Sequence, residues 1–273
     1  MPTAPSAIAS RSNTRVKQLR AAFAGHARLS GGLVALEGNH LVEEALRSGM
    51  LLKTVFLAEH HPLPHYVPAS IEVLRLSGDV FDSLMDTRSP QGIAALMLPP
   101  VGAIDQLLSG IPLILVAVGL QDPGNLGTLV RSAEAFGASG LLTTSGTVSP
   151  WNGKALRASV GSIFRVPVAT AGLDDLHTLQ TRGLKLLAAV GEGVGSDRVV
   201  ELPDTDLTTG VAILIGNEGA GLAPDWLALA DARITIPCAG PVESLNAAVA
   251  GSVILYEAQR QRALVGTRSE PRL

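Results

Sequence analysis

The sequence predicts an α/β protein in which a C-terminal domain built on a parallel sheet follows a smaller N-terminal α/β domain. Two observations lead to this prediction. Apolar runs of strand length alternate with stretches of helical periodicity along most of the chain. The chain also has 273 residues and a hydrophobic content of 47%, which is enough for a large core and allows two domains.

The first domain is expected at residues 1–98, followed by a linker at residues 99–111 with one helical turn. Helices are predicted at residues 39–48, where apolar side chains repeat at helical spacing, and around residues 80–85. Its predicted strands occupy residues 33–36, 53–58, 72–76 and 93–98. These elements make a compact α/β unit of about 100 residues, an ordinary size for a domain.

The second domain is expected at residues 112–273. Its predicted strands are nearly continuous apolar runs, which is typical of a parallel sheet covered by helices on both faces. These runs occupy residues 113–118, 141–144, 163–168, 184–190, 211–215 and 234–236. Ligands of such sheets bind at the carboxyl ends of the strands, so the loops that follow the strands are the places to look for a site.

The composition narrows the classes of protein that the chain can belong to. No window holds the eighteen or so consecutive apolar residues of a membrane span, and residues 1–15 lack the apolar core of a signal peptide. We therefore expect a cytoplasmic protein without a membrane partner. Cys238 is the only cysteine, which excludes an internal disulfide and a zinc site built from cysteines.

Basic charge is concentrated at the start of the chain, although the net charge is only −3. The first 36 residues contain basic side chains and no acidic one. This segment is either an arm that contacts nucleic-acid phosphates or a solvated helix face. Aromatic residues make up only 3% of the chain, so base-stacking platforms are not expected to dominate binding. The candidate RNA-binding residues are Arg11, Arg15, Lys17, Arg20 and Arg28.

The first candidate site loop, residues 119–127, follows the strand predicted at 113–118 and leads into a helix that ends before Gly137. Arg131 lies about 160° around this helix from the centre of its apolar stripe, at 100° per residue. Arg131 therefore faces out of the domain core. It is either a solvated arginine or a group that reaches a phosphate or a ribose.

Two further loops follow later strands. Residues 216–222 hold three glycines in six positions, which either let the backbone approach a ligand closely or form a tight surface turn. Residues 236–246 lead into a long apolar helix predicted from Leu245 to about Ala263. Ser244 is expected to be the N-cap of this helix, a role that would explain it without catalysis. Cys238 is interpreted as a small apolar filler, because no nearby histidine could activate it.

Together the three loops resemble the three sequence motifs of the SpoU/TrmH class of the SPOUT methyltransferases. The resemblance covers about residues 112–262, with the motifs in the order of the family. Gln121 and Asp122 stand where many members carry an asparagine before the proline. The matching positions are Asp122, Pro123, Gly124, Asn125, Leu126, Gly127, Arg131 and Gly137, then residues 215–219, then Ile236, Pro237, Ser244, Leu245, Asn246 and Ala250.

Residues 1–98 are also similar to the N-terminal substrate-recognition domain of this family. The similarity is carried by residues 37–45, which open with Glu37 and Gly38, and by residues 89–92 before the last predicted strand of the domain. It is less specific than the resemblance of the three loops.

The resemblance implies an RNA 2'-O-ribose methyltransferase that uses S-adenosylmethionine and no metal. It implies a deep trefoil knot in the C-terminal domain, although protein chains rarely knot. The implied cofactor-binding residues are Gly216, Asn217, Gly219, Ile236 and Leu245. Arg131 would be the centre of catalysis, and the side chains that hold it and the ribose in register would be Asn125, Glu218, Ser244 and Asn246.

The resemblance also implies a homodimer with the active site at the interface. By analogy, 23S ribosomal RNA is favoured over transfer RNA as the substrate. A tRNA 2'-O-methyltransferase and a non-catalytic RNA-binding protein of the same fold are the alternatives.

Three other patterns in the sequence imitate sites of different chemistry. Gly191, Gly193 and Gly195 imitate the loop of an NAD-dependent enzyme, but their spacing does not match the dinucleotide fingerprint. Gly146 and the Gly153-Lys154 pair imitate a phosphate loop with the wrong spacing and no following Ser or Thr. The histidines at 60, 61 and 65 lie in a proline-rich stretch, which favours a surface loop over a metal site.

Overall fold

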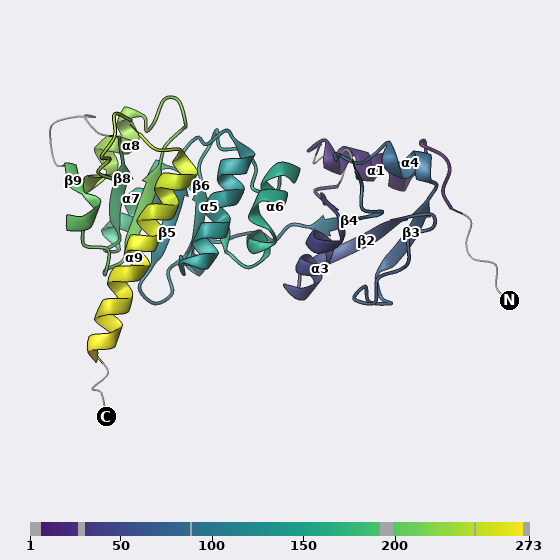
Figure 1. Cartoon of the computed structure of the whole chain (residues 1–273), viewed down its shortest axis with the longest axis horizontal. Helices are drawn as coiled ribbons and strands as arrows, with labels where there is room; N and C mark the ends of the chain where they lie inside the picture. Colours follow the sequence, from purple (N-terminus) through teal and green to yellow (C-terminus); the bar gives the residue numbers. More distant parts are fainter. Residues whose placement is uncertain (1–6, 27–30, 88, 192–198, 243, 270–273) are drawn as a thin grey trace. The chain divides into compact units, whose positions relative to one another are not determined.

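The computed structural model confirms the predicted α/β fold (Figure 1). It describes residues 7–26, 31–87, 89–191, 199–242 and 244–269. The chain divides into two compact units. The first unit comprises Met1–Pro100 and Trp151–Phe164, and the second comprises Val101–Pro150 and Arg165–Leu273.

The first unit is built on a mixed sheet. Among the described residues, it contains four strands in the order β1-β4-β2-β3. These strands are β1 (Val34–Glu37), β2 (Leu51–Ala58), β3 (Glu72–Leu76) and β4 (Ile93–Leu98). β4 runs antiparallel to β1 and β2, whereas β2 and β3 are parallel. The predicted strands of this unit are confirmed, and β2 begins two residues before its predicted start at residue 53.

Helices cover the sheet of the first unit. They are α1 (Thr14–Phe23), α3 (Asn39–Arg47), α4 (Gly78–Asp82) and α6 (Gly153–Ser159). Leu19 of α1 and Phe81 of α4 lie in one apolar core with Phe56 of β2, so these two helices share a face of the sheet. α6 packs against β1 and buries Leu156. A segment that follows residue 150 in the chain therefore completes the first unit.

The second unit contains the predicted parallel sheet. Its strands among the described residues are β5 (Leu113–Ala117), β6 (Gly140–Thr143), β7 (Val168–Thr170), β8 (Lys185–Ala189), β9 (Val199–Glu201), β10 (Val211–Ile215) and β11 (Ala232–Thr235). They are parallel throughout, in the order β7-β6-β5-β10-β8-β11-β9. The knot that the family resemblance implies stays a prediction.

The strand predicted at residues 163–168 is wrong. Val160 and Gly161 adopt positive φ angles of 51° and 88°, which turn the chain just before this apolar run. Ser162–Phe164 then form a 3-10 helix whose Ile163 and Phe164 are buried, and the strand begins only at Val168. An apolar run of this length fits a buried turn as well as a strand, so periodicity could not distinguish them.

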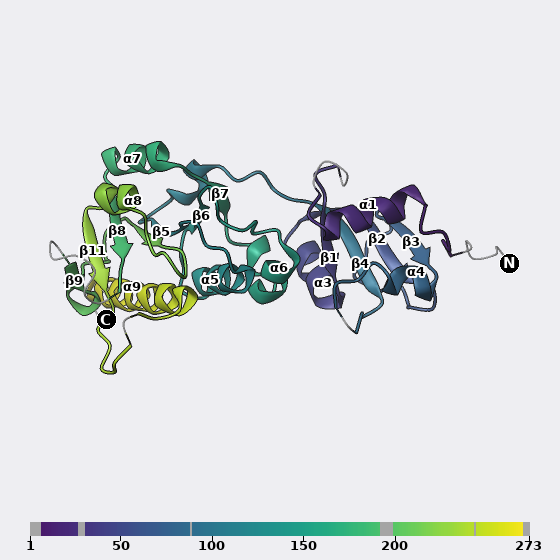
Figure 2. The same ribbon diagram turned by 90° about the horizontal axis from the view of Figure 1, so that it is seen from above.

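Helices cover both faces of the parallel sheet (Figure 2). α7 (Leu173–Thr181) and α8 (Pro224–Leu229) lie on one face, and α5 (Pro123–Ala135) and α9 (Ala247–Ser269) lie on the other. A Cβ atom on Gly251 of α9 would lie 2.4 Å from a methyl carbon of Leu129 of α5. The two helices therefore pack closely, and the hydroxyl oxygens of Ser132 and Ser252 are 2.7 Å apart, in hydrogen-bond contact.

The helical turn expected in the linker is the 3-10 helix η1 (Ile104–Leu107). The predicted end of α5 is confirmed, with Phe136 as its C-cap and Gly137 at a φ of 70°. Arg262 fastens α9 to the sheet, because its guanidinium donates hydrogen bonds to four backbone carbonyl groups. These belong to Ile111, Pro112, Leu207 and Thr209.

Candidate active site

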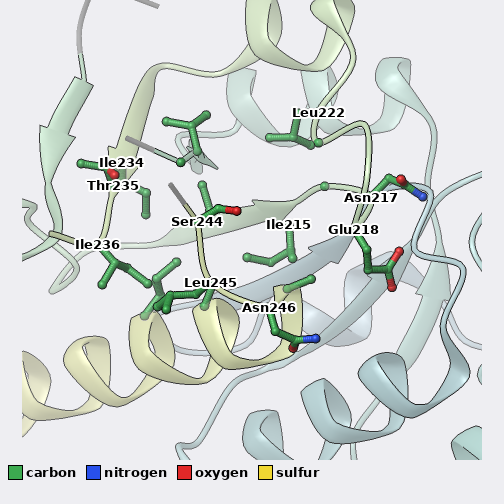
Figure 3. Close-up of a pocket in the computed structure, with 18 of the residues that line it drawn as sticks. Ile215, Asn217, Glu218, Leu222, Ile234, Thr235, Ile236, Ser244, Leu245 and Asn246 are labelled. Atoms are coloured by element: carbon green, nitrogen blue, oxygen red, sulfur yellow. The ribbon is translucent and has the colours of Figure 1, made fainter. Parts of the chain in front are cut away.

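A cavity of about 530 Å³ opens at the carboxyl ends of β8, β10 and β11 (Figure 3). Its wall is formed by residues 215–222, by residues 234–236 and by residues 244–247. These segments contain the second and third loops that the sequence singled out. The five residues predicted to bind the cofactor all line this cavity: Gly216, Asn217, Gly219, Ile236 and Leu245.

The glycine loop after β10 is held in a fixed shape. A Cβ atom on Gly216 would lie 2.4 Å from the carbonyl carbon of Gly221, so position 216 admits only glycine without a backbone shift. Asn217 Oδ1 accepts hydrogen bonds from the backbone N–H groups of Gly219 and Ala220, and its Nδ2 donates to the carbonyl of Gly119. The side chain of Asn217 thus shapes the loop that lines the cavity.

Thr235, at the end of β11, lines the same cavity and was missed by the sequence reasoning. Its Oγ1 atom is buried and makes no hydrogen bond with any of the described residues. A buried hydroxyl without a partner is costly, and a bound polar ligand would satisfy it. The available signal was its place as a polar residue at the carboxyl end of an apolar strand.

A chain of polar side chains joins the three loops beside the cavity. Asn125 Nδ2 donates a hydrogen bond of 3.0 Å to Glu218 Oε1. Asn125 Oδ1 accepts a hydrogen bond of 3.0 Å from Asn246 Nδ2. Glu218 and Asn246 both line the cavity. Three of the residues predicted to be catalytic are therefore brought together by direct contacts.

Glu218 is held in its ionised form. Desolvation raises the pKa of this carboxyl group, but the hydrogen bonds that it accepts outweigh burial and leave its pKa below the ordinary value. The donors are Asn125 Nδ2 and the backbone N–H groups of Gln121 and Asp122, at 3.0, 3.3 and 3.2 Å. The carboxylate thereby fixes the start of the first loop against the second.

The predicted N-cap role of Ser244 is wrong. α9 begins at Ala247, and Asn246 Oδ1 accepts hydrogen bonds from the backbone N–H groups of Ala248 and Val249. Asn246 is therefore the cap, two residues after the predicted position. Ser244 is exposed, lines the cavity and makes no side-chain hydrogen bond with the described residues, so its hydroxyl is available to a ligand.

Arg131 lies apart from the other candidate catalytic residues. It is exposed on α5 next to the buried Leu129 and Val130, which confirms that it faces out of the core. It does not line the cavity, and no hydrogen bond or ion pair joins its side chain to the part of the chain that the structure describes. Within one chain, Arg131 is thus an exposed cation on α5, about one helical turn after the end of the first loop.

Four of the five basic residues proposed to contact RNA are exposed in the first unit: Arg11, Arg15, Lys17 and Arg20. Val16 and Leu19 of α1 are buried, so the helix presents its basic side chains to solvent. Arg15 forms an ion pair of 3.2 Å with Glu72. Arg28 lies outside the described residues. Both interpretations of this segment, an RNA contact and a solvated face, fit the geometry.

The three patterns that imitate other kinds of site are distributed over different parts of the chain. Gly191 lines the cavity, while Gly193 and Gly195 lie outside the described residues. Gly153 and Lys154 begin α6 after the N-cap Asn152. Among the described residues, no group of three or more His, Cys, Asp or Glu side chains is placed to hold a metal. In that same part of the chain, no helix has the length and apolar character to cross a membrane.

Two family models match the chain. The model of the SpoU rRNA Methylase family matches residues 112–256, which is more than half of the chain. The model of the MRM3-like substrate binding domain matches residues 13–95. The first match contains the cavity and all three loops, and the second contains α1, β1, β2, β3 and the start of β4.

Known proteins resemble the chain over nearly its whole length. The 23S rRNA (guanosine(2553)-2'-O)-methyltransferase RlmP of Bacillus subtilis is 32% identical over 91% of this chain and 97% of its own. The 23S rRNA (uridine(2479)-2'-O)-methyltransferase of Streptomyces viridochromogenes is 30% identical over 95% of this chain and 94% of its own.

Among solved structures, the SpoU methyltransferase AviRb of Streptomyces viridochromogenes, in complex with AdoMet, superposes with a TM-score of 0.82. It is 27% identical in sequence and covers 92% of this chain and 98% of its own. By its family model and its relatives, this chain belongs to the SpoU rRNA methylase family.

Proposed function

We propose that the protein transfers a methyl group from S-adenosylmethionine to a ribose 2'-OH of 23S ribosomal RNA in the cytoplasm. The observation that carries the proposal is the contact chain from Glu218 through Asn125 to Asn246, beside a cavity lined by the family's second and third loops. The two relatives above are named as methyltransferases of ribose 2'-OH groups in 23S rRNA.

The cavity suits S-adenosylmethionine in size and chemistry. Its volume of about 530 Å³ lies within the usual range for small-ligand pockets. Ile215, Ile236 and Leu245 offer apolar surface to the adenine, and Gly216 keeps the wall open where a Cβ atom has no room. Thr235 Oγ1 would gain the hydrogen-bond partner that it lacks among the described residues. When bound, S-adenosylmethionine supplies an electrophilic methyl group on a sulfonium sulfur.

The protein's own task is to orient the 2'-OH and to assist the departure of its proton. Asn125 is fixed at both ends of its amide, which leaves its orientation unambiguous. Asn246 is fixed by the helix that it caps. These two amides and the ionised Glu218 form a rigid polar wall, and the unengaged hydroxyl of Ser244 is the group that can hydrogen-bond to the ribose.

Arg131 acts on the substrate as a charged donor in this scheme. A guanidinium keeps its charge in proteins and binds phosphate or polarises a hydroxyl group, rather than serving as an ordinary base. Taking the proton of the 2'-OH would need a phosphate or another partner that tunes it. Because Arg131 has no partner among the described residues, its donors are available to RNA.

The protein acts as a homodimer in this proposal. Val249, Val253 and Tyr256 of α9 lie at helical spacing and remain 48%, 36% and 53% exposed, which gives the helix an apolar outer face. The Tyr256 ring packs on Phe136 at the end of α5, with centroids 5.8 Å apart. A second chain that covers α9 and α5 would bury this face and would bring a partner surface to α5, the helix that carries Arg131.

The two parts of the chain divide the work. Residues 1–98, with the exposed basic face of α1, grip the RNA. Residues 112–273 hold the cofactor and carry out methyl transfer, and residues 99–111 link the two.

The test is transfer of labelled methyl groups from S-adenosylmethionine to protein-free 23S rRNA, 16S rRNA and bulk tRNA. Label on 23S rRNA alone supports the proposal. Label on tRNA alone would support methyl transfer to RNA but would show that the substrate is tRNA and not 23S rRNA. Binding of S-adenosylmethionine without transfer to any of the three RNAs would contradict the proposal and favour a binding-only protein.

A further inference from the structure

The first unit contains a pocket of its own, with a volume of about 300 Å³. One wall lies where β1 ends and α3 begins, and is lined by Glu37, Gly38, His40 and Leu41. The other lies before β4 and is lined by Thr87, Ser89 and Gln91. Arg157 of α6 completes the lining. The pocket therefore combines the substrate-binding part of the chain with one arginine from the stretch matched by the methylase model.

Glu37 supplies a buried acceptor in the wall of this pocket. The residue is only 8% exposed. Its carboxylate accepts hydrogen bonds from the backbone N–H of Asp86 and from the Thr87 hydroxyl, and from no other described residue. A carboxylate has about four acceptor positions, so about two are left for a ligand that donates hydrogen bonds.

The rim of the pocket supplies donors. The Arg157 guanidinium is 35% exposed, and among the described residues its one partner is Asp86, at 3.3 Å. Gln91 Oε1 accepts a hydrogen bond from the backbone N–H of Asn39, which leaves its Nε2 without a partner in the described part of the chain. Gly38 permits this arrangement, because it has a φ of 95° and a Cβ atom there would lie 2.9 Å from Gln91 Oε1.

The size and chemistry of the pocket fit one nucleotide. A volume of about 300 Å³ is at the lower limit for ligand pockets and is too small for a helix or strand of a protein partner. Proteins that recognise RNA bind bases that have left the stack, by hydrogen bonds to the base edges and by arginine contacts. The buried carboxylate of Glu37 could accept hydrogen bonds from the donors of a base edge, and Arg157 at the rim could donate to a phosphate.

We infer that this pocket binds a single unstacked nucleotide of the substrate RNA. The base N–H groups donate hydrogen bonds to the Glu37 carboxylate, and the Arg157 guanidinium binds a phosphate. The inference rests on the proposed function for its substrate class. It assigns RNA recognition to a defined pocket of the first unit, in addition to the exposed basic face of α1. The pocket adds selectivity, because only a nucleotide free of its stack can enter it.

The experiment compares the full-length protein with Arg157→Ala, Ser89→Trp and Arg47→Ala. Ser89 is exposed on the pocket lining, so the tryptophan blocks the pocket without removing a contact. Arg47 is the matched control, since it is an arginine of the same unit that pairs with a carboxylate at 2.7 Å and does not line the pocket. The KM for protein-free 23S rRNA, kcat and the Kd for S-adenosylmethionine are measured for each.

We expect Arg157→Ala to raise the KM about tenfold, because it removes one charge-assisted contact with the RNA. We expect Ser89→Trp to raise the KM by a similar factor, because the indole ring blocks the pocket. We expect kcat and cofactor binding to stay within about twofold, and Arg47→Ala to match the wild type. A KM equal to that of the wild type in both pocket variants would overturn the inference.

A failure of the proposed function gives a different result. In that case the wild type methylates no 23S rRNA, and filter binding of the same RNA replaces KM as the readout. An RNA Kd about tenfold weaker for both pocket variants than for Arg47→Ala still supports the pocket. Equal Kd values for all three variants would overturn it.

Discussion

Asn125 and Glu218, which are 93 residues apart in the chain, are joined by a hydrogen bond of 3.0 Å between Asn125 Nδ2 and Glu218 Oε1. On its other side, the Asn125 amide accepts from Asn246 Nδ2. One side chain thus connects the first, second and third loops. Because both ends of this amide are used, any change at Glu218 also releases Asn125 and affects its contact with Asn246.

Glu218→Gln is expected to lower kcat about 10- to 100-fold, the cost of losing hydrogen bonds to a charged acceptor. The glutamine would present an NH₂ group near three donors that now face a carboxylate. Single-turnover methyl transfer to 23S rRNA measures the effect. Glu257→Gln is the control, because Glu257 is a hydrogen-bonded carboxylate of α9 that does not line the cavity. Equal losses in the two variants would contradict the role of Glu218.

Arg131→Ala is expected to lower kcat at least about a hundredfold while cofactor binding stays normal, because the arginine would act on the 2'-OH and not on S-adenosylmethionine. Isothermal calorimetry gives the cofactor Kd, and transfer of labelled methyl groups gives kcat. The control is Arg182→Ala, which removes an exposed arginine of the same unit. Full turnover by Arg131→Ala would remove Arg131 from the mechanism.

Cys238 offers a direct probe of the cavity. It is the only cysteine of the sequence, is partly buried and lines the cavity, so bound S-adenosylmethionine should shield its thiol. We expect the rate of alkylation by N-ethylmaleimide to fall about tenfold at a cofactor concentration of about ten times Kd. Mass spectrometry over time measures the rate. ATP at the same concentration is the control, and an unchanged rate with saturating S-adenosylmethionine would place the cofactor elsewhere.

Val253→Asp is expected to dissociate the homodimer and abolish activity, because it places a charge in the centre of the apolar face of α9. Sedimentation velocity at micromolar concentration measures the mass. Val101→Asp changes a valine that is 94% exposed outside this face, and it should leave the dimer intact. A wild-type protein that sediments as a monomer with full activity would show that the proposed dimer is not needed.

Much of the fold could be predicted because the strands of a covered parallel sheet are apolar on both sides. The runs at β5 and β10 are buried at every position, so their pattern was unambiguous. β9 has only three residues and was not predicted. Residues 151–164 join the first unit because α6 packs against β1, which is distant in the sequence, and local periodicity does not contain that information.

The sequence predicts those features of the candidate site that follow from the backbone. It does not predict which hydrogen-bond partner a side chain has in the folded protein. The carboxyl ends of parallel strands locate the cavity, and helical periodicity gives the outward direction of Arg131. Ser244 and Asn246 are both good N-cap residues, however, and only the structure shows that Asn246 caps α9. The contact of Asn125 with Glu218 depends on tertiary packing alone.

The central claim is that the product is a 2'-O-methylated ribose in 23S rRNA. The most direct measurement is complete digestion of the methylated 23S rRNA to nucleosides, followed by mass spectrometry. We expect one nucleoside in which the added methyl group remains with the ribose after the glycosidic bond is broken. A methyl group that remains with the base, or a 23S rRNA without added methyl groups, would contradict it.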